Sequence, residues 1–240
     1  MSPQFPTEMV ILAGGYGTRL RSVVSDVPKP MAPVGGRPFL EYLLDYWIAQ
    51  GIRRFILSTG YLGDVVQNHF GNAYRTAAID YMREESPLGT GGALRLALGE
   101  VAWSGKFALM ANGDTWFPID LMLMAADAVL QNKPITIALK ELQKNDRHGG
   151  VEVTSSGAVH AFGVKSSDHT LINAGCYLFE IATVHQELAS YPDTFSLEHD
   201  FLVSYAAGGL VGSSIQNKPF LDIGVPDDYR RAIELLSVAA

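Results

Sequence analysis

The chain has 240 residues, of which 48% are hydrophobic, so it can bury a sizeable core and is not of the disordered class. Its formal net charge of −7 disfavours nucleic acid as a partner, although a local cationic pocket could still hold a phosphate group. No stretch has the length and apolarity of a membrane span or of a signal peptide, so we expect a cytoplasmic protein with no membrane partner. The single cysteine, Cys176, excludes an internal disulfide and is expected to pack in the core.

Apolar runs of strand length alternate with amphipathic stretches. The first two predicted strands cover 9–14 and 54–60, and the helical spacing of the apolar residues between them predicts a crossover helix over 38–51 that stops at Gly51. Two strands joined by a crossover helix should be parallel. Further strands are predicted at 106–114 and 135–140, and further helices at 61–70, 90–98, 118–130, 180–188, 196–207 and 226–236.

Three more strands, at 150–153, 158–162 and 171–179, follow one another with little helix between them, which indicates an antiparallel insertion. The chain has no linker of biased composition and no repeat, so residues 1–240 are predicted to form a single domain. The predicted fold class is α/β: a Rossmann-like, mixed, mainly parallel sheet flanked by helices, with a small antiparallel insertion.

A glycine-rich segment follows the first predicted strand. It runs from Leu12 to Leu20 with the letters LAGGYGTRL, and its glycines allow backbone N–H groups to approach an anion closely. Arg19 adds a planar set of donors that suits phosphate. The spacing matches neither the dinucleotide fingerprint nor the P-loop. A triphosphate loop is one interpretation, and an ordinary glycine-rich turn with a surface arginine is the other.

A rigidly mounted lysine comes soon afterwards, in the segment Pro28-Lys29-Pro30-Met31. Prolines on both sides are expected to hold the backbone of Lys29 extended and stiff. Such a lysine can be aimed at a phosphate, which favours the triphosphate interpretation of the preceding loop.

LAGGYGTRL followed by PKPMAPVGGRPFLEY resembles the signature of the sugar-1-phosphate nucleotidyltransferases. Later segments follow in the family's order, and the combination with PLGTGGAL, ANGDTWF and DIGVPDDY is most similar to the guanylyltransferases that act on a heptose 1-phosphate. The resemblance implies transfer of a nucleotidyl group from a nucleoside triphosphate, here GTP, to a sugar 1-phosphate with release of pyrophosphate, and it implies Mg²⁺ as cofactor. It also leaves open a homo-oligomer.

The resemblance assigns roles to individual residues. It implies catalytic roles for Arg19, Lys29 and Asp114, and a metal-binding pair formed by Asp114 and Asp222. The implied nucleotide contacts are Leu12, Ala13, Gly14, Gly15, Gly17, Thr18, Arg19, Lys29, Glu84, Glu85, Gly89, Thr90, Asn112 and Gly113. The implied sugar-phosphate contacts are Gly150, Lys165, Asn173 and Gly175, and Val164 replaces the glutamate that normally precedes the lysine in the family.

Several of these residues have a second interpretation. Asp114 lies at the end of a predicted strand, where open α/β sheets bind ligands, but it could instead cap the helix that follows. Glu84 and Glu85 could accept both N–H groups of the guanine edge, or could be solvated charges on a turn. Thr90 could belong to an ordinary helix start, and Asn173 could mark a bulge or an edge of its strand.

The sequence leaves three rival functions open. One is a mannose, glucose or N-acetylmuramate 1-phosphate nucleotidyltransferase that uses another base. A non-catalytic nucleotide-binding regulatory subunit is the second, and the charged set Arg19, Lys29, Asp114 and Asp222 argues against it. A metal-dependent glycosyltransferase is the third, and it would need a second aspartate close to Asp114.

Overall fold

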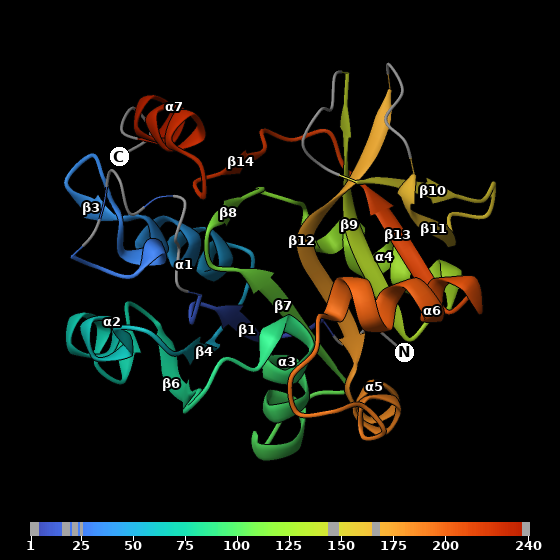
Figure 1. Ribbon diagram of the computed structural model, residues 1–240, viewed down its shortest axis with the longest axis horizontal. Coiled ribbons are helices and arrows are strands. Elements are labelled where there is room, and N and C mark those ends of the chain that lie inside the picture. Colours follow the sequence, from blue (N-terminus) through green and yellow to red (C-terminus); the bar gives the residue numbers. More distant parts are fainter. Residues whose placement is uncertain are drawn as a thin grey trace. The chain divides into compact units, whose positions relative to one another are not determined.

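A computed structural model describes residues 5–15, 20, 24, 26–143, 149–164 and 169–236 (Figure 1). The chain divides into two compact units. Unit 1 comprises Met1–Pro6, Leu88–Met110 and Ile119–Lys218, and unit 2 comprises Thr7–Pro87, Ala111–Pro118 and Pro219–Ala240. The single domain over 1–240 stays a prediction.

Unit 2 contains the parallel strands that the sequence predicts. Strand β1 (Glu8–Leu12) pairs in parallel with β4 (Arg54–Thr59), and β4 pairs in parallel with β6 (Ala77–Arg83). The short β5 (Ala73–Tyr74) adds to β6 in the antiparallel sense. The predicted crossover helix is α1 (Phe39–Ala49), which buries an apolar face and ends just before Gly51, whose φ is +104°. Helix α2 (Gly63–Phe70) lies between β4 and β5 in the chain.

The remaining elements of unit 2 are short except for the last helix. They are the 3₁₀ helix η1 (Lys29–Met31), the antiparallel pair β2 (Pro33–Val34) and β3 (Arg37–Pro38), the antiparallel pair β8 (Thr115–Trp116) and β14 (Leu221–Asp222), and α7 (Pro226–Leu236).

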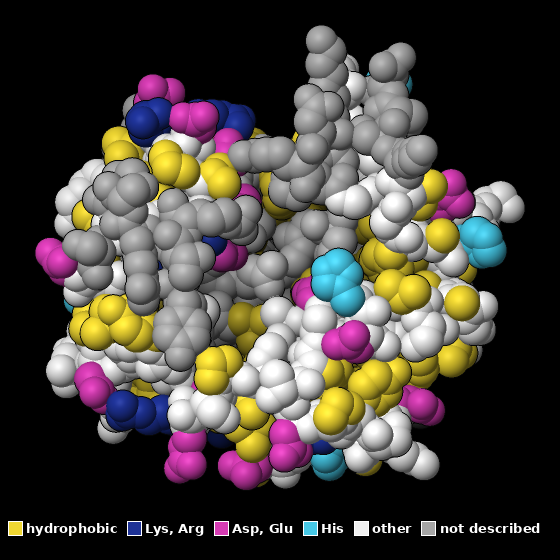
Figure 2. All heavy atoms as spheres, in the orientation of Figure 1, with side chains coloured by type: hydrophobic (Ala, Val, Ile, Leu, Met, Phe, Trp, Pro, Cys, Tyr) yellow, Lys and Arg dark blue, Asp and Glu magenta, His cyan; other side chains and the backbone are white. Residues whose placement is uncertain are grey.

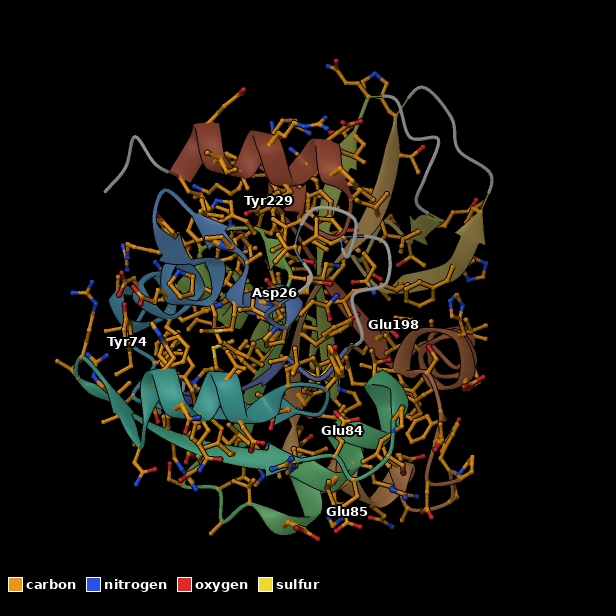
Figure 3. All side chains as sticks on the ribbon, turned by 60° about the vertical axis from the view of Figure 1, so that its left-hand side comes forward. Asp26, Tyr74, Glu84, Glu85, Glu198 and Tyr229 are labelled. Atoms are coloured by element: carbon orange, nitrogen blue, oxygen red, sulfur yellow. The ribbon has the colours of Figure 1, made fainter. Side chains whose placement is uncertain are left out.

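Helix α7 is amphipathic and packs on β2. The hydroxyl of Tyr229, which is buried, donates to the carbonyl of Pro33 at 2.5 Å (Figure 3). Over the outer side of α7, basic and acidic side chains lie next to one another (Figure 2). Two ion pairs along the helix join residues three positions apart: Asp227 with Arg230, both exposed, and the buried Asp228 with Arg231.

Unit 1 is built on a mixed set of strands. Strand β9 (Ile135–Leu142) pairs in parallel with β13 (Val211–Ile215) and in the antiparallel sense with β12 (Thr170–Glu180). Strands β10 (Gly150–Val153) and β11 (Val159–Val164) pair antiparallel, and β10 also pairs with β12. This arrangement confirms the predicted antiparallel cluster. Strand β7 (Phe107–Asn112) contributes its first four residues to unit 1 and its last two to unit 2.

The helices of unit 1 are α3 (Gly89–Glu100), α4 (Leu121–Gln131), α5 (Ile181–Leu188), the π-helix η2 (Leu197–Leu202) and α6 (Val203–Ala207). The sequence predicts one helix over 196–207, whereas the structure has a π-helical segment followed by a short α-helix. Strands β6 and β13 were not predicted, because β13 (VGSSI) contains a glycine and two serines and β6 (AAIDYMR) has few β-branched residues.

The fold class is confirmed as α/β, with a mixed, mainly parallel central sheet, flanking helices and small antiparallel sheets. Among the residues that the structure describes, no helix has the length and apolarity needed to cross a membrane.

Candidate active site

The glycine-rich segment of unit 2 leaves β1 at Leu12 and passes close to β4. The backbone N–H of Ala13 donates to the carbonyl of Ser58 at 2.8 Å. A Cβ atom on Gly14 would lie 2.9 Å from Glu84 Oε1 and 3.1 Å from the backbone nitrogen of Gly60, so this position has little room for a side chain. Gly15 is exposed. Gly17, Thr18 and Arg19 lie outside the described residues, and their roles stay predictions.

Lys29 is held by a short turn. Pro28 is extended, with φ −64° and ψ 151°, but Lys29–Met31 form one turn of 3₁₀ helix in which Met31 N–H donates to the Pro28 carbonyl at 2.7 Å. The predicted extended backbone at Lys29 is therefore wrong. The fixed φ of Pro30 suits a 3₁₀ turn as well as an extended strand, and the burial of Pro30 and Met31 favours the turn. The two prolines still restrict the backbone on both sides of Lys29.

Asp114 and Asp222 are brought together by backbone pairing, although they lie far apart in the chain. Strands β8 and β14 pair so that Asp222 lies opposite Thr115, and the N–H of Ile223 donates to the carbonyl of Asp114 at 3.0 Å. Gly113, in turn, donates its N–H to the Leu12 carbonyl at 2.9 Å, which ties this segment to the end of β1.

The ammonium group of Lys29 lies between the two carboxylates. Its Nζ atom is 2.5 Å from Asp114 Oδ2 and 3.6 Å from Asp222 Oδ1, and only 11% of the lysine side chain is exposed. Each carboxylate is also oriented by a neighbour, since Thr115 donates to Asp114 Oδ1 at 3.2 Å and the N–H of Gly224 donates to Asp222 Oδ1 at 2.7 Å.

Gly224 makes this ion cluster possible. A Cβ atom at this position would overlap Lys29 Nζ and would lie 2.6 Å from Asp222 Oδ1. Gly224 was not among the predicted site residues. One sequence feature could have indicated Gly224: it lies two residues after Asp222, at a position where a side chain would crowd the carboxylate.

The two carboxylates fit a divalent cation. Two carboxylates this close repel each other unless a positive charge lies between them, and the Lys29 ammonium group supplies that charge in this structure. Mg²⁺ is commonly held by one or two carboxylates together with substrate oxygens, which is the set that Asp114 and Asp222 can offer.

The alternative interpretation of Asp114 as a helix cap is wrong. Helix α4 begins at Leu121, and its cap is Asp120, whose Oδ1 accepts from the N–H of Leu123 at 3.1 Å. The cap is Asp120 because the segment between Asp114 and α4 forms β8, which pairs with β14 instead of starting the helix.

Glu84 and Glu85 line an open pocket of unit 2 with a volume of about 260 Å³. Both follow the end of β6 (Figure 3). Glu84 is half-buried, and its Oε1 accepts from the hydroxyl of Ser58 at 2.8 Å, whereas Glu85 is exposed. Gly14 also lines the pocket, together with Gly60, Tyr61, Arg83, Ser86 and Pro87. Ser58 and Tyr61 were not predicted, because neither belongs to a motif.

The segment that contains Gly89 and Thr90 forms the first turn of α3 in unit 1. It packs tightly against residues 193–198: the N–H of Gly91 donates to the Phe195 carbonyl at 3.0 Å, and Cβ atoms on Gly91 and Gly92 would overlap the Phe195 ring and the Asp193 carbonyl. These glycines therefore have a packing role, which is compatible with a nucleotide contact at Thr90.

Replacing Gly91 by alanine is expected to lower the free energy of unfolding by about 1–3 kcal/mol, because the added methyl group must displace the Phe195 ring. Chemical denaturation of the purified protein measures the change. Gly15→Ala is the control, because its Cβ position has open space around it, and it should leave the free energy of unfolding nearly unchanged. Gly36 also has open space but is not suitable, because its positive φ would strain any side chain. Equal stabilities of Gly91→Ala and Gly15→Ala would contradict the packing role.

Asn173 lies at the start of a bulge in β12. The register against β9 shifts between Asn173 and Tyr177, Gly175 has a φ of +69°, and its N–H donates to Asn173 Oδ1 at 3.0 Å. A Cβ atom on Gly150 would lie 2.9 Å from the Val164 carbonyl, which gives that glycine a packing role. Lys165 lies outside the described residues.

Tyr177 and Glu198 extend this group of polar residues, and the sequence analysis named neither. The hydroxyl of Tyr177 accepts from Asn173 Nδ2 at 2.9 Å and donates to Glu198 Oε1 at 2.8 Å. The neighbouring Cys176 is buried, and burial raises the pKa of its thiol to about 12, so it stays protonated and packs in the core as expected.

Known proteins with similar sequences belong to one enzyme family. Residues 8–237 match the nucleotidyl transferase family. The chain is 41% identical, over 94% of its length and 96% of the relative, to the D-glycero-α-D-manno-heptose 1-phosphate guanylyltransferase of Aneurinibacillus thermoaerophilus. It is 38% identical, over 92% of its length and 96% of the relative, to the enzyme of the same name from Campylobacter jejuni.

A solved structure is also similar. The crystal structure of HddC from Yersinia pseudotuberculosis complexed with GMP-PN superimposes with a TM-score of 0.80 at 32% identity, covering 96% of this chain and 99% of HddC. Given the glycine-rich segment after β1, the aspartate pair with its lysine and a match that covers nearly the whole sequence, the chain belongs to the nucleotidyl transferase family.

Proposed function

We propose that this protein transfers a guanylyl group from GTP to D-glycero-α-D-manno-heptose 1-phosphate, giving GDP-heptose and pyrophosphate. The observation that carries the proposal is the cluster of Lys29, Asp114 and Asp222, which combines a cation with two carboxylates of the kind that suits Mg²⁺. The names of the two bacterial relatives support the choice of base and sugar. GTP is made and consumed in the cytoplasm, where we expect the reaction to occur.

The reaction is a single in-line displacement. An oxygen of the sugar 1-phosphate attacks the α-phosphorus of GTP, a new P–O bond forms, and the bond to pyrophosphate breaks. The attacking phosphate is already ionised at neutral pH, so no general base is required. The protein's contribution is to orient two anions and to stabilise the charge that develops between them.

Each charged residue has a place in this scheme. Lys29 contacts the α-phosphate, Arg19 the departing pyrophosphate, and Lys165 the phosphate of the sugar. Asp114 and Asp222 would hold Mg²⁺, which would supply further charge neutralisation for the phosphate oxygens. Backbone N–H groups of Gly14 and Gly15 are donors for the triphosphate, because these glycines carry no side chain that would keep the phosphates away.

The pocket beside Glu84 and Glu85 is the proposed site for the base. Guanine offers N1–H and N2–H on one edge, and a carboxylate can accept from both. Glu84 is the better placed of the two, since it is half-buried and Ser58 orients its Oε1, whereas Glu85 is exposed. A uracil or thymine ring would leave the carboxylate without the second donor.

In a matrix of nucleoside triphosphates against sugar 1-phosphates, with pyrophosphate release as the readout, GTP with the heptose 1-phosphate is expected to give the highest kcat/KM. Leaving the carboxylate unpaired costs about 1–3 kcal/mol, so UTP and dTTP should be about 5- to 150-fold poorer. Glu84→Gln should reduce this preference more than Glu85→Gln, which serves as the adjacent control. Comparable turnover with UTP would exclude the guanylyl assignment, and a higher kcat/KM with mannose 1-phosphate would exclude the heptose.

A further inference from the structure

Glu198 is the common acceptor of a hydrogen-bonded chain in unit 1. One of its oxygens, Oε1, accepts from the hydroxyl of Tyr177 at 2.8 Å. The other, Oε2, accepts from the hydroxyl of Thr90 at 2.6 Å and from that of Ser196 at 3.1 Å. A single carboxylate thus joins α3, β12 and the π-helix η2, three elements that are distant in sequence.

The branch through Tyr177 orients Asn173. Tyr177 is fully buried, and this burial, together with the adjacent carboxylate of Glu198, raises the pKa of its hydroxyl well above the usual value, so the hydroxyl stays protonated. Because its proton goes to Glu198, its oxygen accepts from Asn173 Nδ2 at 2.9 Å. The amide oxygen of Asn173 accepts from Gly175 N–H, so the amide plane is held at both ends and the direction of its second N–H is set.

The branch through Thr90 orients the first turn of α3. The oxygen of the Thr90 hydroxyl accepts from the N–H of Leu197 at 2.9 Å, which directs its proton to Glu198. Every donor in both branches therefore points toward the carboxylate. An amide at position 198 has only one acceptor atom and would turn an NH₂ group toward one of the two hydroxyls.

We propose that Glu198 is a positioning residue that holds the sugar-phosphate contact Asn173 and the nucleotide contact Thr90 in their binding geometry. This inference rests on the proposed function, since it needs both residues to touch substrate. Glu198 itself acts through Tyr177 and Thr90. Glu198 lies in the π-helix η2. Such wider turns are often found at functional sites.

The test measures KM for GTP and for the heptose 1-phosphate in four variants. Glu198→Ala should raise both values about tenfold or more. Tyr177→Phe, which removes one hydroxyl, should raise KM for the sugar phosphate alone, and Thr90→Val should raise KM for GTP alone. Glu187→Ala, at an exposed carboxylate on α5 of the same unit, is the matched control and should change neither value.

A double-mutant comparison distinguishes a positioning role of Glu198 from a general effect on the structure. In the Tyr177→Phe background, Glu198→Ala should raise KM for the sugar phosphate by less than twofold, because the branch is already broken. Should Glu198→Ala prove too unstable to purify, the nearly isosteric Glu198→Gln must still raise at least one of the two KM values.

Different outcomes overturn different claims. An active wild-type enzyme with unchanged KM values in the Glu198 variants, or with fully additive effects of Glu198→Ala and Tyr177→Phe, overturns the positioning role alone. A folded wild-type protein that transfers no guanylyl group to any sugar 1-phosphate overturns the proposed function, and the positioning role with it.

Discussion

Replacing Lys29 by methionine is expected to lower kcat/KM for guanylyl transfer by about 10²–10³-fold, the typical effect of removing one donor that stabilises developing negative charge. Methionine keeps much of the length of the side chain but removes the ammonium group. The measurement is pyrophosphate release at saturating Mg²⁺. Lys106→Met is the matched control, since Lys106 also forms an ion pair, with Glu180 at 3.0 Å, but is exposed and carries no proposed catalytic role.

The same variant should also change stability in a way that depends on Mg²⁺. Without the ammonium group, the carboxylates of Asp114 and Asp222 face each other with no counter-charge. The side chains of Asp114 and Asp222 are 32% and 21% exposed. The free energy of unfolding should therefore fall by about 1–2 kcal/mol, less than the 3–5 kcal/mol that breaking a fully buried ion pair typically costs. For a chain of this size the melting temperature should fall by about 2–8 °C in the presence of a chelator.

Millimolar Mg²⁺ should restore much of that stability in Lys29→Met, because the divalent ion replaces the missing positive charge. A Lys29→Met enzyme with wild-type kcat/KM would show that the lysine does not act on the phosphates. An equal loss of stability with and without Mg²⁺ would show that the lysine and the metal do not share the two carboxylates.

Asp114→Asn and Asp222→Asn are each expected to raise the Mg²⁺ concentration that gives half-maximal activity by at least tenfold. An amide has the shape of the carboxylate but offers the ion a neutral oxygen, and Mg²⁺ binds carboxylates in preference. The backbone contacts that place both residues, the β8–β14 pairing and the bond from Ile223 to the Asp114 carbonyl, do not involve the side chains. The fold should therefore be retained.

A second readout for these variants does not depend on turnover. Thermal denaturation with and without Mg²⁺, in the presence of a non-hydrolysable GTP analogue, should show a smaller stabilisation by the ion in either variant than in the wild type. Asp227→Asn is the control, because this carboxylate also lies in unit 2 but is 86% exposed on α7. Wild-type Mg²⁺ dependence in both site variants would place the metal on other ligands.

Helices with a strong local pattern were predicted nearly to the residue. The apolar spacing before Gly51 predicts α1, and Pro226 marks the first residue of α7, because periodicity, capping and proline geometry are properties of neighbouring residues. Strand β13 was not predicted, because its two serines are buried in a strand that pairs with β9, which is far away in the chain.

In the candidate site, too, some features could be predicted from local sequence and others depend on contacts between distant segments. The sequence by itself determined which residue types are present and that Asp114 and Asp222 belong together, through strand ends and the family resemblance. Only the tertiary structure decided that Lys29 lies between them, that Gly224 leaves the space for it, and that Glu198 joins Thr90 to Tyr177. These contacts depend on strand pairing and packing between distant segments, and a local pattern of residues carries no information about such distances.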